Sequence, residues 1–321
     1  IDPATILGWL HACDEYHGEQ CHSFDSPRSD IECNTDMIFM DAQQQCLVSV
    51  PSGHVKRYAA LSYVWGNDLN PFMTLRDNFN QLRKPGAFST NNQFPQLPDA
   101  VRDSTLISKL GLHLLWVDRT IVQDDQETKA EQLAAMAAIY TNAYFTIAAT
   151  EGTAQSGLAG SSHDRPRRNP YRTFRFTSEC HMMDRNPSVA EDAGDQGPYH
   201  TRGWTFQGWT LSRRVLIFHH QTISWRCRRL NRQENGTMPY DWVTPAYRWS
   251  IFHDMWSGIP NIESYIYHLG SYTQRDLTVP GDVLNAFQGI LITLARSMRG
   301  HMLFGIPELF FSALLLWCPS D

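Results

Sequence analysis

The sequence lacks a long uninterrupted hydrophobic run of the kind that crosses a membrane. A spanning helix needs about eighteen or more consecutive apolar residues, and the most apolar stretch, residues 302–317, is interrupted by Gly305, Pro307 and Glu308. The sequence also shows no evident signal peptide. These two absences exclude the membrane-protein class and predict a soluble protein of the cytoplasm with no membrane partner.

Positive charge is also scarce. The formal net charge is −6, and the arginines at 165, 167, 168 and 172 form one local basic loop rather than a basic face. A protein that binds nucleic acid through phosphates needs such a face. We therefore expect no nucleic-acid partner.

Cysteines are few: the chain has seven in 321 residues, which is an odd number. An odd count in a chain large enough to build a hydrophobic core favours reduced thiols over a disulfide framework. One local group stands out, because Cys13, His17 and Cys21 follow each other at intervals of four residues and would share one face of a helix. Zinc accepts these donors, but its usual short ligand spacing is tighter. The favoured interpretation is no metal, with this helix packing its Trp9, Cys13 and His17 inward.

No nucleoside-triphosphatase motif, repeat array or convincing Ser-His-Asp order is present, so the strongest chemical signal lies elsewhere. The apolar residues 114–117 end on Asp118 and lead into the polar residues Gln123, Asp124 and Asp125. A buried strand that ends on an acid is typical of α/β folds, in which strand ends converge on a ligand-binding edge. Asp118 is therefore a candidate site residue.

The surrounding segments predict an α/β domain. Residues 58–66 and 144–149 have the composition of strands, and residues 97–110 and 131–140 have the periodicity of helices. The strand at 114–117, the helix at 131–140 and the strand at 144–149 make a βαβ unit and, with the strand at 58–66, predict a parallel sheet of three strands. Residues 215–218 and 222–225 are typical of a hairpin. From residue 242 the pattern becomes helical and aromatic.

These patterns divide the chain into three parts. We expect an N-terminal helix and lead-in strand in residues 1–55, an α/β domain in residues 56–235 and a mostly α-helical C-terminal subdomain in residues 236–321. Residues 161–200 are rich in Pro, Arg, Asp and Ser, which indicates a long excursion from the α/β domain.

Four motifs together resemble a known family. They read YAALSYVWG at 58–66, LWVD through QDD at 115–125, MAAIYTNA at 136–143 and RGWTFQ at 202–207. In this order and at these spacings they are similar to the fungal heterokaryon-incompatibility (HET) domain. The segments 9–21 and 277–290 also look like the flanking regions of such proteins.

The resemblance implies a TIR/flavodoxin-like, Rossmann-like fold with a doubly wound parallel sheet, and a role in fungal allorecognition that can trigger cell death. TIR-like domains include both NAD hydrolases and noncatalytic scaffolds, so an NAD-like nucleotide is an open candidate for substrate or ligand, and no cofactor is certain.

Two departures from the family's pattern bear on chemistry. The family carries a cysteine before the position of Ile121, whereas here Thr120 precedes it directly, through either a deletion or a modified cysteine absent from the printed sequence. The family also carries glutamate where this chain has Gly208. Without that carboxylate, NAD hydrolysis is not expected.

We predict a small-molecule or nucleotide crevice at the strand ends. Its catalytic candidates are Asp118, Asp124 and Gln123, and its ligand-binding candidates are Ser62, Trp65, Arg202, Trp204 and Gln207. Each also has an ordinary structural interpretation: Asp118 and Asp124 as helix caps, Gln123 as a loop tether and Trp65 as packing.

Three functions stay open from sequence. The first is a nonself-recognition protein with this crevice. The second is an enzyme repurposed for secondary metabolism, a hydrolase or lyase that uses Asp118 and the unseen cysteine. The third is a noncatalytic module that self-associates into a homo-oligomer.

Overall fold

The computed structural model describes residues 1–18, 21, 35–55, 57–68, 71–89, 97–161, 173–177, 181–183, 197–219, 222–234, 255, 259–298 and 300–316. Most of the predicted excursion at 161–200 and the aromatic segment at 242–256 lie outside these residues, apart from Met255.

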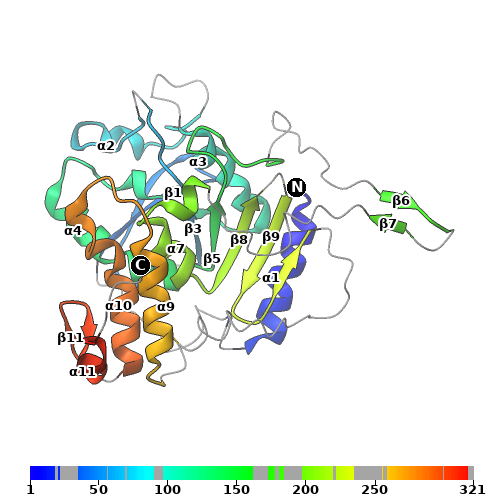
Figure 1. Cartoon of the computed structure of the whole chain (residues 1–321). Helices are drawn as coiled ribbons and strands as arrows, with labels where there is room; N and C mark the ends of the chain where they lie inside the picture. The colour runs from blue at the N-terminus through cyan, green and yellow to red at the C-terminus, as the bar shows by residue number, and fades with distance from the viewer. Residues whose placement is uncertain are drawn as a thin grey trace.

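An eight-stranded sheet forms the centre of the molecule (Figure 1). Its strand order is β10-β9-β8-β5-β3-β4-β1-β2. The strands are β1 (Met37–Asp41), β2 (Cys46–Val50), β3 (Tyr58–Ser62), β4 (Leu114–Trp116), β5 (Phe145–Ala149), β8 (Arg214–His219), β9 (Thr222–Cys227) and β10 (Asn231–Gln233).

The sheet is mixed rather than wholly parallel. The four central strands β4, β3, β5 and β8 are parallel to one another. On either side, β1 and β2 and then β9 and β10 are added in antiparallel fashion. The α/β class is confirmed, but the prediction of a parallel sheet was too simple. β2, β9 and β10 each follow an antiparallel neighbour through a hairpin, which needs only a short connection and no crossover helix.

The predicted βαβ unit is present, with one strand inserted between its two members. β4 and β5 both pair with β3, and two consecutive helices, α4 (Gln126–Ala134) and α5 (Met136–Asn142), connect them. β3 and β5 are buried along their whole length, as expected for strands covered on both faces. The predicted hairpin is β8 with β9.

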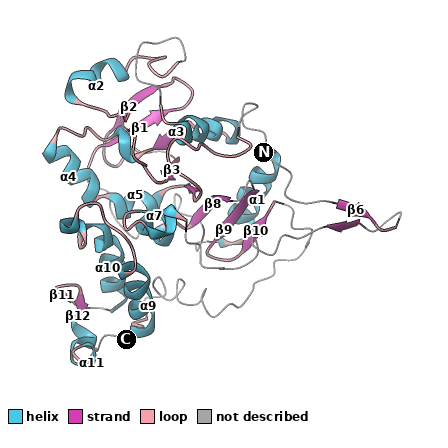
Figure 2. Ribbon diagram, turned by 45° about the horizontal axis from the view of Figure 1, so that its top comes forward, coloured by secondary structure: helices cyan, strands magenta, loops and turns pink. Residues whose placement is uncertain are grey.

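Helices cover both faces of the sheet (Figure 2). Side chains that alternate along a strand point to opposite faces, so Ala59 and Leu61 join one core and Tyr58 and Ala60 the other. The first core includes α1 (Pro3–Tyr16), α3 (Asp99–Ser104) and η2 (Thr105–Leu110). The second includes α5, α7 (Thr205–Leu211), α9 (Ile262–Thr273) and α10 (Asn285–Met298).

The remaining elements are short. They are α2 (Arg76–Leu82), η3 (Asp118–Thr120), β6 (Thr173–Arg175), β7 (His181–Met183), α6 (Pro198–Thr201), η5 (Pro280–Asp282), β11 (Met302–Leu303), β12 (Ile306–Pro307), η6 (Glu308–Phe310) and α11 (Phe311–Leu314). β6 and β7 pair with each other alone and project from the body of the molecule (Figures 1 and 2).

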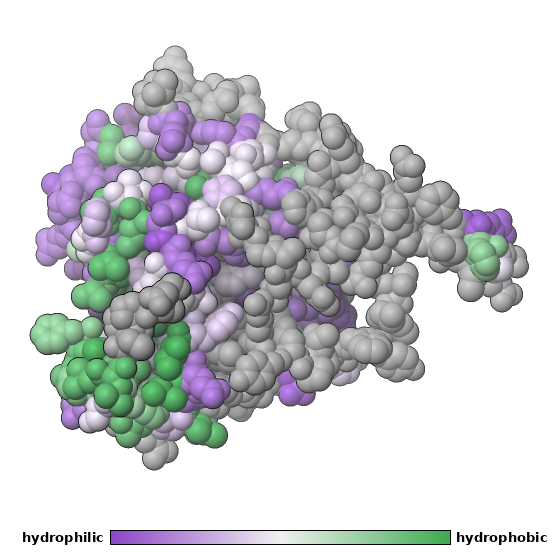
Figure 3. Space-filling model, viewed as in Figure 1, coloured by the Kyte–Doolittle hydropathy of each residue, from purple (hydrophilic) through white to green (hydrophobic). Residues whose placement is uncertain are grey.

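Exposed apolar side chains gather around the C-terminal elements. Figure 3 shows a hydrophobic surface over the region of α10, β11 and α11. Exposed residues in these elements and the turns beside them include Ile292, Leu303, Phe304, Leu309 and Leu315. Among the described helices, none has the length and hydropathy that a transmembrane segment requires.

Candidate functional site

The carboxyl ends of β3 and β4 bring two predicted site residues into contact. Because the strands are parallel neighbours, the residues that follow them emerge at the same edge of the sheet. Trp65 follows β3, and Asp118 begins the turn η3 after β4. The indole Nε1 of Trp65 donates a hydrogen bond of 2.6 Å to Oδ2 of Asp118.

Asp118 lies in an environment that disfavours its charge. The residue as a whole is partly exposed, but its Oδ1 atom is buried. Burial raises the pKa of the Asp118 carboxyl, and the nearby Trp65, Tyr63 and Arg119 offset only part of this effect. Within the described residues, neither Oδ1 of Asp118 nor the hydroxyl of Tyr63 has a hydrogen bond of normal geometry. Among the described residues Oδ1 of Asp118 thus has no partner at normal hydrogen-bond geometry, although Tyr63 and the backbone of Arg119 still stabilise the charged carboxylate.

Arg119 is a residue that sequence reasoning missed. It is 1% exposed, its guanidinium carbon lies 4.7 Å from the centre of the Trp65 ring, and its Nη2 donates to the Trp65 carbonyl oxygen at 3.2 Å. In the described part of the chain its Nε and Nη1 have no hydrogen-bond partner. Such donors are costly to bury unsatisfied. No local sequence signal could have found it, because the fold alone turns its side chain back over Trp65.

Ser62 contacts a tyrosine instead of an open crevice. Its hydroxyl lies 2.8 Å from the hydroxyl of Tyr199, a buried residue of α6. Burial raises the pKa of Tyr199 to about 12. The Tyr140 hydroxyl, whose pKa burial also raises well above the usual range, donates to the Leu61 carbonyl. The hydroxyl groups of Ser62, Tyr140 and Tyr199 are thus neutral at physiological pH. They form a buried hydrogen-bonded cluster below the carboxyl end of β3.

Gly208 packs directly against Ser62 and Tyr140. A Cβ atom at Gly208 would lie 2.7 Å from Ser62 Oγ and 3.0 Å from Tyr140 Cε1. No side chain fits there without displacing one of these residues. At the position where the resembled family has glutamate, the space in this chain is therefore occupied by Ser62 and Tyr140.

Gln123 and Asp124 make structural hydrogen bonds in the loop after β4. Gln123 Nε2 donates to the carbonyls of Asp118 and Ile121 at 3.2 and 3.0 Å. The Asp124 carboxylate accepts from the backbone N–H of Arg76 at 2.9 Å, at the first residue of α2. Gln123 thus holds the Asp118 turn in place. The catalytic roles of both residues stay predictions.

Arg202, Trp204 and Gln207 belong to a second group that faces the C-terminal helices. The Arg202 guanidinium donates to Thr278 Oγ1 at 2.5 Å, and Gln207 Nε2 donates to the Asn285 carbonyl at 3.1 Å. Trp204 packs against the core that contains α9 and α10. In the described residues no hydrogen bond or ion pair joins them to Asp118. These contacts do not test the ligand-binding role of the three residues, which stays a prediction.

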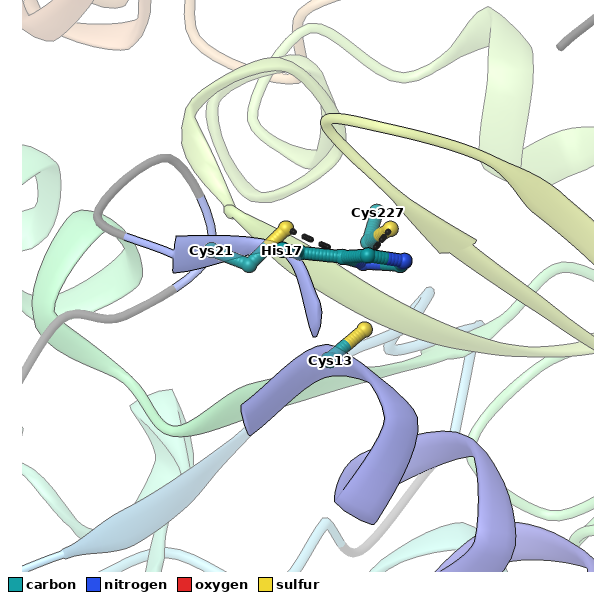
Figure 4. Close-up of side chains that lie close together, drawn as sticks. All are labelled: Cys13, His17, Cys21 and Cys227. Atoms are coloured by element: carbon teal, nitrogen blue, oxygen red, sulfur yellow. Dashed lines mark hydrogen bonds between the residues drawn. The ribbon is translucent and has the colours of Figure 1, made fainter. Parts of the chain in front are cut away.

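The three candidate metal ligands come together, and a fourth joins them. Cys13 lies on α1, His17 caps that helix and Cys21 follows, while Cys227 comes from the end of β9 (Figure 4). The four ligand atoms lie within 4.8 Å of one another. Cys227 is 210 residues from His17, so no local spacing could have revealed it.

The resemblance seen in the motifs is borne out by comparison with family models. Residues 58–208 match the heterokaryon incompatibility protein (HET) family. This HET region starts at β3 and ends within α7, so it contains Trp65, Asp118, Arg119 and Gly208. The cysteine and histidine cluster lies wholly outside it. No curated protein and no solved structure matches the chain.

Proposed function

We propose that this protein acts in heterokaryon incompatibility, the nonself recognition between fungal cells that ends in cell death. The match of residues 58–208 to the HET family supports this function. Within that region, one observation supports the carboxyl ends of β3 and β4 as the site: Asp118 accepts a hydrogen bond from Trp65, its pKa is raised by burial, and its Oδ1 is buried without a partner of normal geometry among the described residues. Perturbed titratable groups of this kind cluster at functional sites.

The topology favours a ligand at this edge. The four parallel strands lie in the order β4-β3-β5-β8 across the sheet. Counted along the chain, these are the second, first, third and fourth of the parallel strands. The same order occurs in flavodoxin-like sheets, in which ligands bind at the carboxyl ends of the strands where the order reverses, and this likeness supports a ligand here. In this chain the order reverses between β3 and β5, and the end of β3 carries Ser62 and leads into Trp65.

The side chains favour a small molecule with an anionic group, such as a nucleotide. Among the described residues two nitrogens of Arg119, Nε and Nη1, have no acceptor, and the face of the Trp65 indole opposite Arg119 is a flat surface for a ring. Asp118 would act as a general base or as an electrostatic partner. Since Gly208 replaces the glutamate of the resembled family, we assign ligand recognition rather than NAD hydrolysis to this edge.

The test is a titration of the purified chain with NAD and with ATP by calorimetry, paired with induced expression in a filamentous fungus and measurement of growth. Asp118→Asn and Trp65→Phe should weaken binding at least about tenfold, the loss of about 1.4 kcal/mol expected for one hydrogen bond to a charged group. The same variants should relieve growth arrest. Asp124→Asn, which changes an exposed helix contact, is the matched control and should behave as wild type.

Two results would contradict the proposal. If Asp118→Asn and Trp65→Phe arrest growth as strongly as wild type, the edge is not the functional site. If the wild-type chain does not arrest growth at all, the incompatibility function itself is wrong. Circular dichroism of each variant distinguishes loss of a site from loss of the fold.

A second candidate function is self-association without catalysis. The exposed apolar residues around α10, β11 and α11 favour it, because patches of this kind on soluble proteins often mark interfaces (Figure 3). Phe304, which is 98% exposed, lies in this surface. Light scattering should then show an oligomer that Phe304→Ser weakens. A wild-type chain that stays monomeric at the highest soluble concentration would rule this candidate out.

A further inference from the structure

Four metal-binding side chains from two distant parts of the chain meet inside the first core. They are Cys13, His17, Cys21 and Cys227. Cys13, Cys21 and Cys227 are at most 2% exposed, and His17 is 9% exposed. Figure 4 shows the three cysteine side chains around the His17 ring. We propose that these residues form a structural zinc site of three cysteines and one histidine.

The distances fit a single zinc ion. Zinc bonds sulfur at about 2.3 Å and nitrogen at about 2.0 Å, and tetrahedral geometry then places a sulfur about 3.6 Å from the nitrogen and two sulfurs about 3.8 Å apart. His17 Nδ1 lies 3.7 Å from Cys21 Sγ and 3.4 Å from Cys227 Sγ. All four ligand atoms fall within 4.8 Å of one another. A span this small suits one ion and not a larger cluster.

The three thiols hydrogen-bond one another, but hydrogen bonding to His17 alone does not account for the two sulfurs beside its ring nitrogen. Two sulfurs flank the same ring nitrogen, yet Nδ1 of a neutral imidazole is either one donor or one acceptor. It can therefore satisfy one of Cys21 and Cys227 and not both. A metal ion bonded to all three atoms satisfies them together, with the thiols deprotonated.

Surrounding groups support the sulfurs as thiolates. Trp225 Nε1 donates to Cys13 Sγ at 3.3 Å, and the backbone N–H of Arg229 donates to Cys227 Sγ at 3.4 Å. Donors of this kind typically surround metal-bound ligands and orient them. The buried guanidinium of Arg214 also interacts electrostatically with Cys13 and Cys21. It offsets the charge of −1 that zinc and three thiolates carry together.

The role that follows is structural. Four protein ligands fill a tetrahedral site and leave no position for water or substrate. Because Cys13 and His17 belong to α1 while Cys227 ends β9, the ion cross-links the N-terminal helix to the antiparallel side of the sheet. The site lies outside the HET region at 58–208, so it would fix the strands next to that region without taking part in its chemistry.

Metal content of the purified full chain tests this inference. Under reducing conditions and without chelator, elemental analysis should find about one zinc ion per chain. His17→Ala and Cys227→Ser should lower this value to near zero. His17→Cys supplies a fourth thiolate and should keep the metal. Cys46→Ser is the matched control, since Cys46 is also buried but lies on β2 away from the cluster, and it should keep full zinc.

Cobalt exchange gives a readout that does not depend on the stability of the variants. Replacing zinc by Co²⁺ in the wild-type chain should produce the strong visible bands of tetrahedral cobalt with thiolate ligands. A reduced chain that takes up neither zinc nor cobalt would overturn the proposal. So would a disulfide between two of the three cysteines found by peptide mass spectrometry, or zinc retained in full by both His17→Ala and Cys227→Ser.

Discussion

His268 should make the stability of this protein depend strongly on pH. The side chain lies on α9, is fully buried and packs against Phe206 at 6.3 Å between ring centres. Burial lowers the pKa of His268 to about 4, whereas an unfolded histidine titrates near about 6.5. The unfolded chain therefore binds a proton that the folded chain rejects. Stability from this residue is complete above about pH 6.5 and falls as the pH drops toward about 4.

The size of the effect follows from the shift. A difference of about 2.5 pKa units corresponds to about 3 kcal/mol of unfolding free energy lost over that pH range. This is a large part of the stability of a typical domain. His268→Leu has similar volume and no proton to gain, so it should not show this loss.

Urea denaturation of both proteins at several pH values measures the difference directly. Subtracting the two curves cancels the titration of groups other than His268. The unfolding free energy of the wild type relative to His268→Leu should fall by about 3 kcal/mol from about pH 7 to about pH 4. His113→Gln, at an exposed position, is the control and should run parallel to wild type. Parallel curves for wild type and His268→Leu would refute the reasoning.

Three further perturbations have defined outcomes in denaturation experiments. Gly208→Ala should lower the unfolding free energy by about 2 kcal/mol, because its Cβ would overlap Ser62. Gly270→Ala, in a helix with free space around it, should instead raise the unfolding free energy by up to about 1 kcal/mol. Equal effects of the two substitutions would contradict the packing argument. Asp14→Asn should cost about 3 kcal/mol, since it removes the partner 2.6 Å from the buried Arg214, and a change below about 1 kcal/mol would show that the pair is not stabilising. Asp118→Asn should raise the melting temperature at neutral pH, where the charged carboxylate opposes folding. This gain should shrink as the pH falls through the raised pKa of Asp118, and a gain that does not change with pH would disprove the burial argument.

Local patterns in the sequence predicted much of the central sheet. The apolar runs that became β3 and β5 are buried throughout, so composition and length were enough to identify them. The predicted helix at 97–110 is α3 followed by the 3-10 helix η2, and the hairpin of β8 with β9 was also expected. The sequence predicted one lead-in strand in place of the antiparallel pair β1 and β2, because the pairing of β1 with β4, which joins this pair to the sheet, depends on residues far apart in the chain.

Some residues of the candidate site could likewise be identified from sequence, and others could not. Asp118 and Trp65 could be identified from sequence because the end of a strand is visible in the pattern of apolar residues. Arg119 could not, because nothing local shows that its side chain turns back over Trp65. Arg202 and Gln207 were grouped with Asp118 by motif order alone, whereas their hydrogen bonds go to Thr278 and Asn285.

By itself, then, the sequence determined the α/β class, the strand-end acid and the HET motifs, since each rests on residues that are neighbours in the chain. Only the tertiary structure decided which distant residues meet. It placed Ser62 and Tyr140 where Gly208 has no side chain, and it brought Cys227 to the ligands on and just after α1. The physical reason is that sheet pairing and helix packing, not chain proximity, fix these contacts, and both depend on the whole fold.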